Sequence, residues 1–158
     1  MADIIIKKAK DEYSKDIWKW RNDKVTRKMS KNSAYIPWDN HKKWFSEAIK
    51  DPNTLFYIGK VGNISIGSIR FVKDQKCIDN YYVNINISPN FRGKGLSKDF
   101  LKNGIKRFLS DVNKINILKA EVKNINNKSN KLFLDYGFEK VGILTNGINT
   151  FRLIISKT

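Results

Sequence analysis

Cysteine and histidine are almost absent from this sequence, and each absence excludes a kind of site. A single cysteine, Cys77, cannot form a disulfide within the chain. Together with the single histidine, His41, it is too little for a His/Cys zinc site, so we predict no metal. The fold must therefore rest on a hydrophobic core, and 41% hydrophobic residues in 158 positions suffice for one domain, residues 1–158.

Long hydrophobic runs are also lacking. No apolar stretch approaches the ~20 residues that span a bilayer, which predicts no membrane insertion. Residues 1–4 lack the basic segment, apolar centre and cleavage site of a secretory signal. We therefore expect a cytoplasmic protein.

Negative charge is scarce. The chain has 31 basic and 15 acidic residues, a net charge of +16, which favours anionic partners. Six of the 31 basic residues are arginines, and the other 25 are lysines scattered among asparagines and isoleucines. The composition of an AT-rich genome explains such a charge equally well. Because the lysines are dispersed and no RNP, KH or zinc motif occurs, we predict no specific nucleic acid partner.

Short hydrophobic segments with regular spacing make up most of the chain. Alternation and β-branched residues predict strands at residues 2–7, 55–61, 64–72, 81–87, 115–122, 139–144 and 150–156. A helical apolar pattern predicts helices at residues 13–22, 39–50, 96–109 and 129–136. Asp39 is the expected N-cap of the second helix, and residues 24–37 are expected to be irregular. This order predicts a mixed α/β sheet.

The most informative segment joins the strand at 81–87 to the helix at 96–109. It contains Gly93 and Gly95, two residues apart, just before the helix. A strand, a glycine turn and a helix start gather backbone N–H groups at a positive helix end, which suits a phosphate or diphosphate. An ordinary chain reversal has the same composition, so both interpretations are open. The spacing excludes a P-loop and a GxGxxG dinucleotide fingerprint.

Two segments in order resemble signatures of the GNAT N-acetyltransferases. Residues 92–97, Arg-Gly-Lys-Gly-Leu-Ser, are similar to the motif (Arg/Gln)-x-x-Gly-x-(Gly/Ala), with Ser97 as the departure. Residues 126–138 are similar to the segment N-x-x-(A/S)…L-(Y/F)…G-F of that family. The resemblance covers essentially the whole chain. It implies the GNAT fold, a mostly antiparallel sheet of about seven strands flanked by about four helices.

The resemblance also implies transfer of an acetyl group from acetyl-CoA to an amine. Backbone N–H groups of the glycine turn would hold the CoA diphosphate, and the preceding strand would pair with the pantetheine arm. The implied cofactor-binding residues are Ile85, Ile87, Arg92, Gly93, Lys94, Gly95, Leu96, Ser97, Asn126, Ser129 and Phe133. Direct attack by the amine needs no covalent enzyme intermediate, so Cys77 need not be a nucleophile.

The catalytic groups follow the family pattern less closely. Phe133 stands where many members carry a tyrosine general acid, and Tyr82 stands where relatives often place a glutamate. Tyr136 lies one turn after Phe133, while Glu121 and Asp79 are substitutes for the base. We take Glu121, Tyr82 and Tyr136 as the catalytic candidates.

The N-terminal third resembles a subgroup that acts on amino-sugar nucleotides, of the pseudaminic acid pathway type. The matching segments are W-R-N-D at 20–23 with an arginine at 27, and H-K-K-W-F at 41–45. They imply a small anionic amine as acceptor, bound by Arg21, Asn22, Arg27, His41 and Trp44. The alternative is that the aromatic residues only pack two helices on the sheet.

Other functions stay open on the sequence alone. An acetyltransferase for protein N-termini, of the ribosomal-protein type, would need an acidic groove, which the positive charge disfavours. Phe133 also fits a domain that binds CoA without catalysis, and the charge fits a nucleic-acid-binding module. The oligomeric state is not determined, and a homodimer is one of the options.

Overall fold

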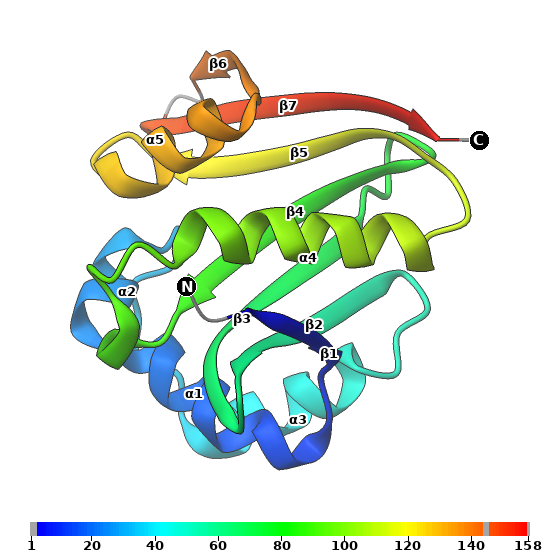
Figure 1. Ribbon diagram of the computed structural model, residues 1–158. Helices are drawn as coiled ribbons and strands as arrows, with labels where there is room; N and C mark the ends of the chain where they lie inside the picture. The colour runs from blue at the N-terminus through cyan, green and yellow to red at the C-terminus, as the bar shows by residue number, and fades with distance from the viewer. Residues whose placement is uncertain (1–2, 144–145, 158) are drawn as a thin grey trace.

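The computed structural model describes residues 3–143 and 146–157 and shows one seven-stranded sheet with helices on both faces (Figure 1). The strands lie in the order β1-β2-β3-β4-β5-β7-β6. Their bounds are β1 (Ile5–Lys8), β2 (Thr54–Val61), β3 (Ile64–Lys73), β4 (Asn80–Ile87), β5 (Ile115–Lys123), β6 (Glu139–Ile143) and β7 (Ile148–Lys157). Only β4 and β5 run parallel to each other, which confirms the predicted mixed, mostly antiparallel α/β fold.

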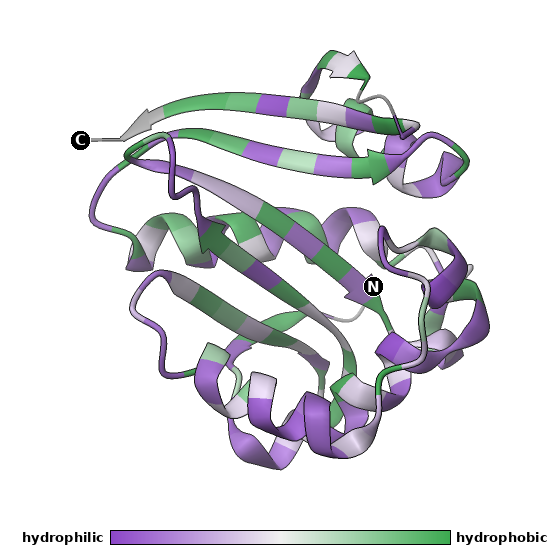
Figure 2. Cartoon of the chain, turned by 180° about the vertical axis from the view of Figure 1, so that it is seen from behind, coloured by the Kyte–Doolittle hydropathy of each residue, from purple (hydrophilic) through white to green (hydrophobic). Residues whose placement is uncertain are grey.

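Helices cover both faces of the sheet. In the described residues they are α1 (Ser14–Asn22), α2 (Lys24–Met29), α3 (Trp38–Ala48), α4 (Ser97–Asp111) and α5 (Asn127–Tyr136), with short 3-10 turns η1 (Asp11–Tyr13) and η2 (Pro89–Phe91). Helices α4 and α5 lie on one face, and α1 to α3 lie on the other (Figure 1). Seen from behind, hydrophobic residues concentrate along the central strands, while the outer helices α1 to α3 are largely hydrophilic (Figure 2).

Alternation along the strands separates two hydrophobic clusters. The larger cluster lies between the sheet and α4 with α5, where Phe71 and Phe108 stack with ring centroids 4.1 Å apart. The smaller cluster lies under α1 and α3 and consists of Ile17, Trp20, Phe45, Phe56 and Ile58. Since successive strand residues face opposite sides, a polar residue between two residues of the larger cluster faces α1 to α3.

Strands β4 and β5 pair over only part of their length. Three residues of β4, Asn80 to Tyr82, are in register with residues 117–119 of β5. Strand β4 then continues to Ile87 paired with β3 alone, and β5 continues to Lys123 paired with β7 alone. The two strands diverge toward α2 and α5 in both views (Figures 1 and 2). Each strand therefore presents free main-chain N–H and C=O groups to an extended ligand between them.

The predicted elements are confirmed apart from their ends, with one omission. Residues 24–29 form α2 instead of irregular chain, because the carboxylate of Asp23 accepts the N–H groups of Val25 and Thr26 at 3.1 and 3.2 Å. The prediction that Asp39 caps the second helix is wrong, because α3 begins at Trp38 and Asp39 lies in its first turn. Residues 2 and 144 of the predicted strands lie outside the described residues.

Candidate active site

The turn between β4 and α4 has a backbone that glycine adopts most easily. The φ angle is +71° at Gly93 and +73° at Gly95. A Cβ added at either position would meet no atom within 4 Å. The left-handed backbone, and not crowding inside the chain, therefore accounts for glycine at both positions. The space next to both glycines is open, in the turn before α4.

The peptide N–H groups of residues 93–99, in this turn and the first turn of α4, have no acceptor in the described chain. The N–H of Arg92 donates to the carbonyl of Pro89 at 3.4 Å. The next backbone bond runs from the N–H of Phe100 to the carbonyl of Leu96 at 3.0 Å. None of the N–H groups of residues 93–99 donates to the rest of the described chain. Because a helix start is also electropositive, this run of donors can bind an anion.

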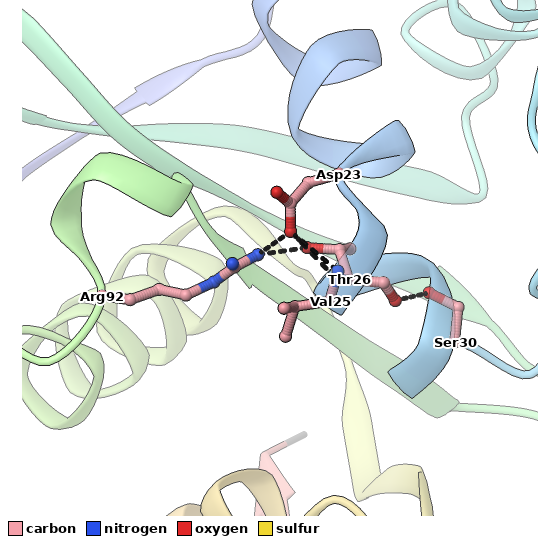
Figure 3. A network of polar contacts seen from close by, with 5 residues as sticks. All are labelled: Asp23, Val25, Thr26, Ser30 and Arg92. Atoms are coloured by element: carbon pink, nitrogen blue, oxygen red, sulfur yellow. Dashed lines mark hydrogen bonds and ion pairs between the residues drawn. The ribbon is translucent and has the colours of Figure 1, made fainter.

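The side chain of Arg92 is bound to the corner between α1 and α2 (Figure 3). Its Nη2 lies 2.7 Å from Oδ2 of Asp23 and 2.5 Å from Oγ1 of Thr26. Burial alone would raise the pKa of Asp23, but the hydrogen bonds from Arg92 and from the N–H of Thr26 hold this pKa below its usual range. The guanidinium thus ties the glycine turn to the opposite helical layer, while the predicted anion contacts of the turn are left to its main chain.

The divergent strand ends and the start of α5 lie at the same edge of the sheet, because β4 and β5 are parallel. Ile85 and Ile87, on the unpaired part of β4, pack against the larger cluster. Asn126 caps α5 by accepting the N–H of Ser129 at 3.2 Å, and its carbonyl accepts the side chain of Asn130 at 2.8 Å. These predicted cofactor residues therefore lie at the edge of the sheet where β4 and β5 separate.

The two rings predicted on α5 contact the core. Phe133 is 3% exposed, with its ring centroid 5.0 Å from that of Phe138 and 6.1 Å from that of Phe151. The ring of Tyr136 also packs against Phe138, and burial raises the pKa of its hydroxyl. The contacts described for both rings are packing contacts, and their roles toward cofactor and leaving group stay predictions.

Tyr82 and Glu121 lie on the face under α1 to α3. Tyr82 is the last residue of β4 in register with β5, and burial raises the pKa of its hydroxyl, which stays protonated at neutral pH. The Nζ of Lys119 lies 5.4 Å from the centroid of the Tyr82 ring. Oε1 of Glu121 is 2.8 Å from Nζ of Lys31. Asp79 precedes β4, at the end away from the divergence.

Arg21, Arg27 and Arg70 lie on this side of the sheet and form no ion pair with an acidic residue of the described chain. Arg21 donates from Nη2 to the carbonyl of Asn32 at 2.7 Å, and Arg27 donates from Nε to the carbonyl of Ser33 at 3.1 Å. Burial lowers the pKa of Arg21, and the charge of Arg27 lowers it further. Burial and the charge of Arg21 together lower the pKa of Arg70 to about 10. The positive charges thus act on one another in two pairs, Arg27 on Arg21 and Arg21 on Arg70.

Arg70 was not among the residues predicted from the sequence. It lies on β3, and its guanidinium carbon is 5.0 Å from the ring centroid of Trp44 and 5.8 Å from that of Phe56. Trp44 is 41% exposed, so this predicted acceptor residue is partly open to solvent. The available signal was a lone arginine among the hydrophobic residues of a predicted strand.

His41 and Asn22 are engaged inside the helical layer. His41 is 2% exposed, lies 3.0 Å from the carbonyl oxygen of Ser14 through Nε2, and stacks on Phe45. Burial lowers the pKa of His41, which keeps its ring neutral at neutral pH. The side chain of Asn22 donates to the carbonyl of Ile36 and accepts the N–H of Ile36, both at 2.8 Å. Both side chains thus connect segments within the helical layer, and contact with an acceptor stays a prediction.

Two surface hollows lie away from these residues. One, of about 470 Å³, is at the β1–β2 edge, and the other, of about 390 Å³, is next to residues 73–78. Neither is lined by the glycine turn or by the three arginines. Within residues 3–143 and 146–157, no group of three or more His, Cys, Asp or Glu side chains could hold a metal ion. No helix in the same residues has the length and apolar character needed to cross a membrane.

A helix start with unpaired N–H groups lies beside two diverging parallel strands. Taken with the family comparison, this arrangement indicates that the protein is an acetyltransferase. Residues 26–152 match the family model described as acetyltransferase (GNAT) domain. The match spans most of the chain, and the chain belongs to the GNAT family of N-acetyltransferases. No curated protein matches the chain in sequence.

Solved structures share the fold at low sequence identity. Spermidine N-acetyltransferase from Vibrio cholerae, in complex with CoA and spermine, is 14% identical over 96% of this chain and 95% of its own, with a TM-score of 0.87. A domain from Methanocaldococcus jannaschii is 20% identical over 98% and 100%, with a TM-score of 0.81. AAC(6')-Ib, in complex with ribostamycin and coenzyme A, is 11% identical over 96% and 93%, with a TM-score of 0.83.

Proposed function

We propose that this protein transfers the acetyl group of acetyl-CoA to the amino group of a small acceptor, and that this acceptor is a nucleotide-linked amino sugar. The binding of acetyl-CoA rests on one observation, the run of unpaired N–H groups at residues 93–99, in the glycine turn and the first turn of α4. A diphosphate satisfies several such donors at once and is attracted by the helix start.

The rest of acetyl-CoA fits the divergence between β4 and β5. An extended pantetheine arm has amide groups that can pair with the free edge of β4 at residues 83–87, as an added strand would. Ile85 and Ile87 provide an apolar wall on the side of α4. Two of the structural neighbours were solved with coenzyme A, which supports coenzyme A as the ligand of this fold.

Acetyl-CoA supplies a thioester carbonyl that a neutral amine attacks, forming a C–N bond as the C–S bond breaks. Two protons must move: the attacking nitrogen loses one, and the departing thiolate gains one. Tyr82 is at the point where the strands separate, and its protonated hydroxyl is the donor that we assign to the thiolate. Glu121, on the facing strand, is the carboxylate that we assign to the ammonium proton, directly or through water.

The choice of acceptor rests on charge. Arg21, Arg27 and Arg70 lie on the face where Tyr82 and the free part of β4 are found, and a nucleotide diphosphate offers them oxygen atoms. Polyamines and aminoglycosides, bound by the structural neighbours, are cations that these arginines would repel. The exposed ring of Trp44 offers a surface on which a base can stack.

The release of free thiol from acetyl-CoA tests this proposal. The acceptors would be a UDP-linked 4-amino sugar, spermidine, an aminoglycoside and a peptide with a free N-terminus. We expect turnover with the amino-sugar nucleotide and little with the two polycations. Turnover with spermidine alone would overturn the choice of acceptor, whereas failure to bind CoA in calorimetry would overturn the whole proposal.

A further inference from the structure

Two guanidinium groups in the acceptor region have buried donors that nothing in the described chain satisfies. These donors are Nη1 of Arg21 and Nε of Arg70. Arg70 makes no hydrogen bond or ion pair with any described residue, and its contacts are the rings of Trp44 and Phe56. Most buried polar groups in folded proteins are hydrogen-bonded, and a buried charge without a partner is costly. Two such donors, on the contacting elements α1 and β3, therefore indicate that a partner comes from outside the chain.

The nearby carboxylates do not compensate these charges. Asp23 is bound by Arg92 at 2.7 Å, and Glu121 is bound by Lys31 at 2.8 Å. The only charges that act on the pKa of Arg21 and of Arg70 come from other arginines, and both lower it. The cluster is thus positive and self-repelling as it stands, and an anion placed among these groups would remove both penalties.

The register of the sheet places this cluster beside the free part of β4. Arg70 is the cross-strand partner of Asn84, which is exposed and lies two residues beyond the last pairing with β5. Adjacent strands are about 4.8 Å apart, so an anion at Arg70 lies about one or two strand spacings, roughly 5–10 Å, from a ligand along β4.

We propose that Arg70, with Arg21, forms a receptor for an oxyanion of the acceptor, a phosphate or a carboxylate carried a few bonds from the amine that is acetylated. This rests on the proposed function, because it assumes that the acetyl group is delivered along β4. Arg70 is then a residue that determines specificity: its planar donors fix the anion and so orient the amine toward the thioester. The same site excludes polycationic amines by charge.

Calorimetry on the full chain saturated with CoA tests the receptor, because CoA then occupies the glycine turn. The probes are pyrophosphate, inorganic phosphate and succinate at constant ionic strength. We expect at least one of them to bind the wild-type protein, and the better probe assigns the oxyanion as phosphate or carboxylate. We expect Arg70→Met to lose about tenfold or more in affinity for that probe. Arg152→Met, which removes an arginine on β7 paired with Glu139, is the charge-matched control and should bind as the wild type does.

Stability separates a binding role from a packing role. Because the charge of Arg70 is partly buried and unpaired, Arg70→Met without ligand should unfold at the same temperature as the wild type or higher, while losing the stabilisation by the probe. Arg21→Met should show the same loss of binding if Arg70→Met fails to fold. The receptor is overturned if no probe binds to the CoA-saturated protein or if both variants bind as tightly as the wild type. Failure of CoA itself to bind would instead overturn the proposed function.

Discussion

The two sides of the candidate site are built from different parts of the polypeptide. The proposed cofactor side consists of main chain: the N–H groups of residues 93–99 and the free edges of β4 and β5. The proposed acceptor side consists of side chains, with guanidinium groups from α1, α2 and β3. A main-chain site depends on the local backbone and tolerates many side chains, whereas a side-chain site changes with single substitutions. One fold can therefore keep acetyl-CoA as the acetyl donor while the amine that accepts the acetyl group varies.

Replacing Gly95 by glutamate should break the cofactor side alone. The substitution puts a negative charge into the anion site and a side chain at φ +73°. We expect CoA affinity to fall about 100-fold or more, since a carboxylate competes with the diphosphate and repels it. Calorimetry with CoA measures this effect. Gly95→Ala is the control, because it adds the backbone strain without the charge and should lose much less affinity.

Replacing Tyr82 by phenylalanine should affect the chemical step and spare both binding sites. General acid catalysis is commonly worth about 100-fold or more, so kcat should fall by about that factor. The KM for acetyl-CoA should change little, because the diphosphate is held elsewhere. Steady-state kinetics measure both constants. An unchanged kcat would remove Tyr82 from the mechanism and leave Tyr136 as the remaining tyrosine candidate.

Breaking the pair of Arg92 and Asp23 should show how the two sides are joined. This ion pair links the glycine turn to the α1–α2 corner, and its side chains are only 28% and 26% exposed. We expect Arg92→Met and Asp23→Asn each to lower the free energy of unfolding by about 1–3 kcal/mol. The double variant should lose less than the sum, since both remove one interaction. Additive losses in urea denaturation would show that the contact contributes little.

Acid should weaken this link in a defined direction. The pKa of Asp23 is lower in the folded chain than its ordinary value of about 3.9. The resulting stabilisation is complete above the unfolded-state pKa and is lost as the pH falls through the folded-state pKa. Between pH 5 and pH 2, the wild-type melting temperature should fall further than that of Asp23→Asn. Equal slopes would mean that Asp23 has no part in acid sensitivity.

The sequence allowed the cofactor side to be predicted better than the acceptor side, for a physical reason. Gly93 and Gly95 lie two residues apart just before an amphipathic helix, so the turn and its N–H groups follow from local rules. The divergence of β4 from β5 depends on tertiary register, which the alternation within one strand does not contain. The omission of α2 has a similar cause, since Asp23 both caps it and binds Arg92, 69 residues away.

Arg70 shows the same limit on the acceptor side. Arg21 and Trp44, which act on or contact Arg70, lie in α1 and α3, far from β3 in the sequence. Only the folded chain brings them together. His41 shows a different limit. Its place in a resembling motif predicts contact with the acceptor, and this stays a prediction for a side chain that is 2% exposed between aromatic rings.

Amide chemical shifts in a ¹⁵N-labelled sample test most directly whether main-chain N–H groups bind the diphosphate of CoA. The spectrum of the free protein would be compared with spectra recorded in the presence of CoA and in the presence of pantetheine, which lacks the diphosphate. The amides of residues 93–99 should move strongly with CoA and hardly at all with pantetheine, whereas amides along β4 should respond to both. If the amide chemical shifts of residues 93–99 do not change when CoA binds, the diphosphate is bound elsewhere, and these N–H groups are not the cofactor site.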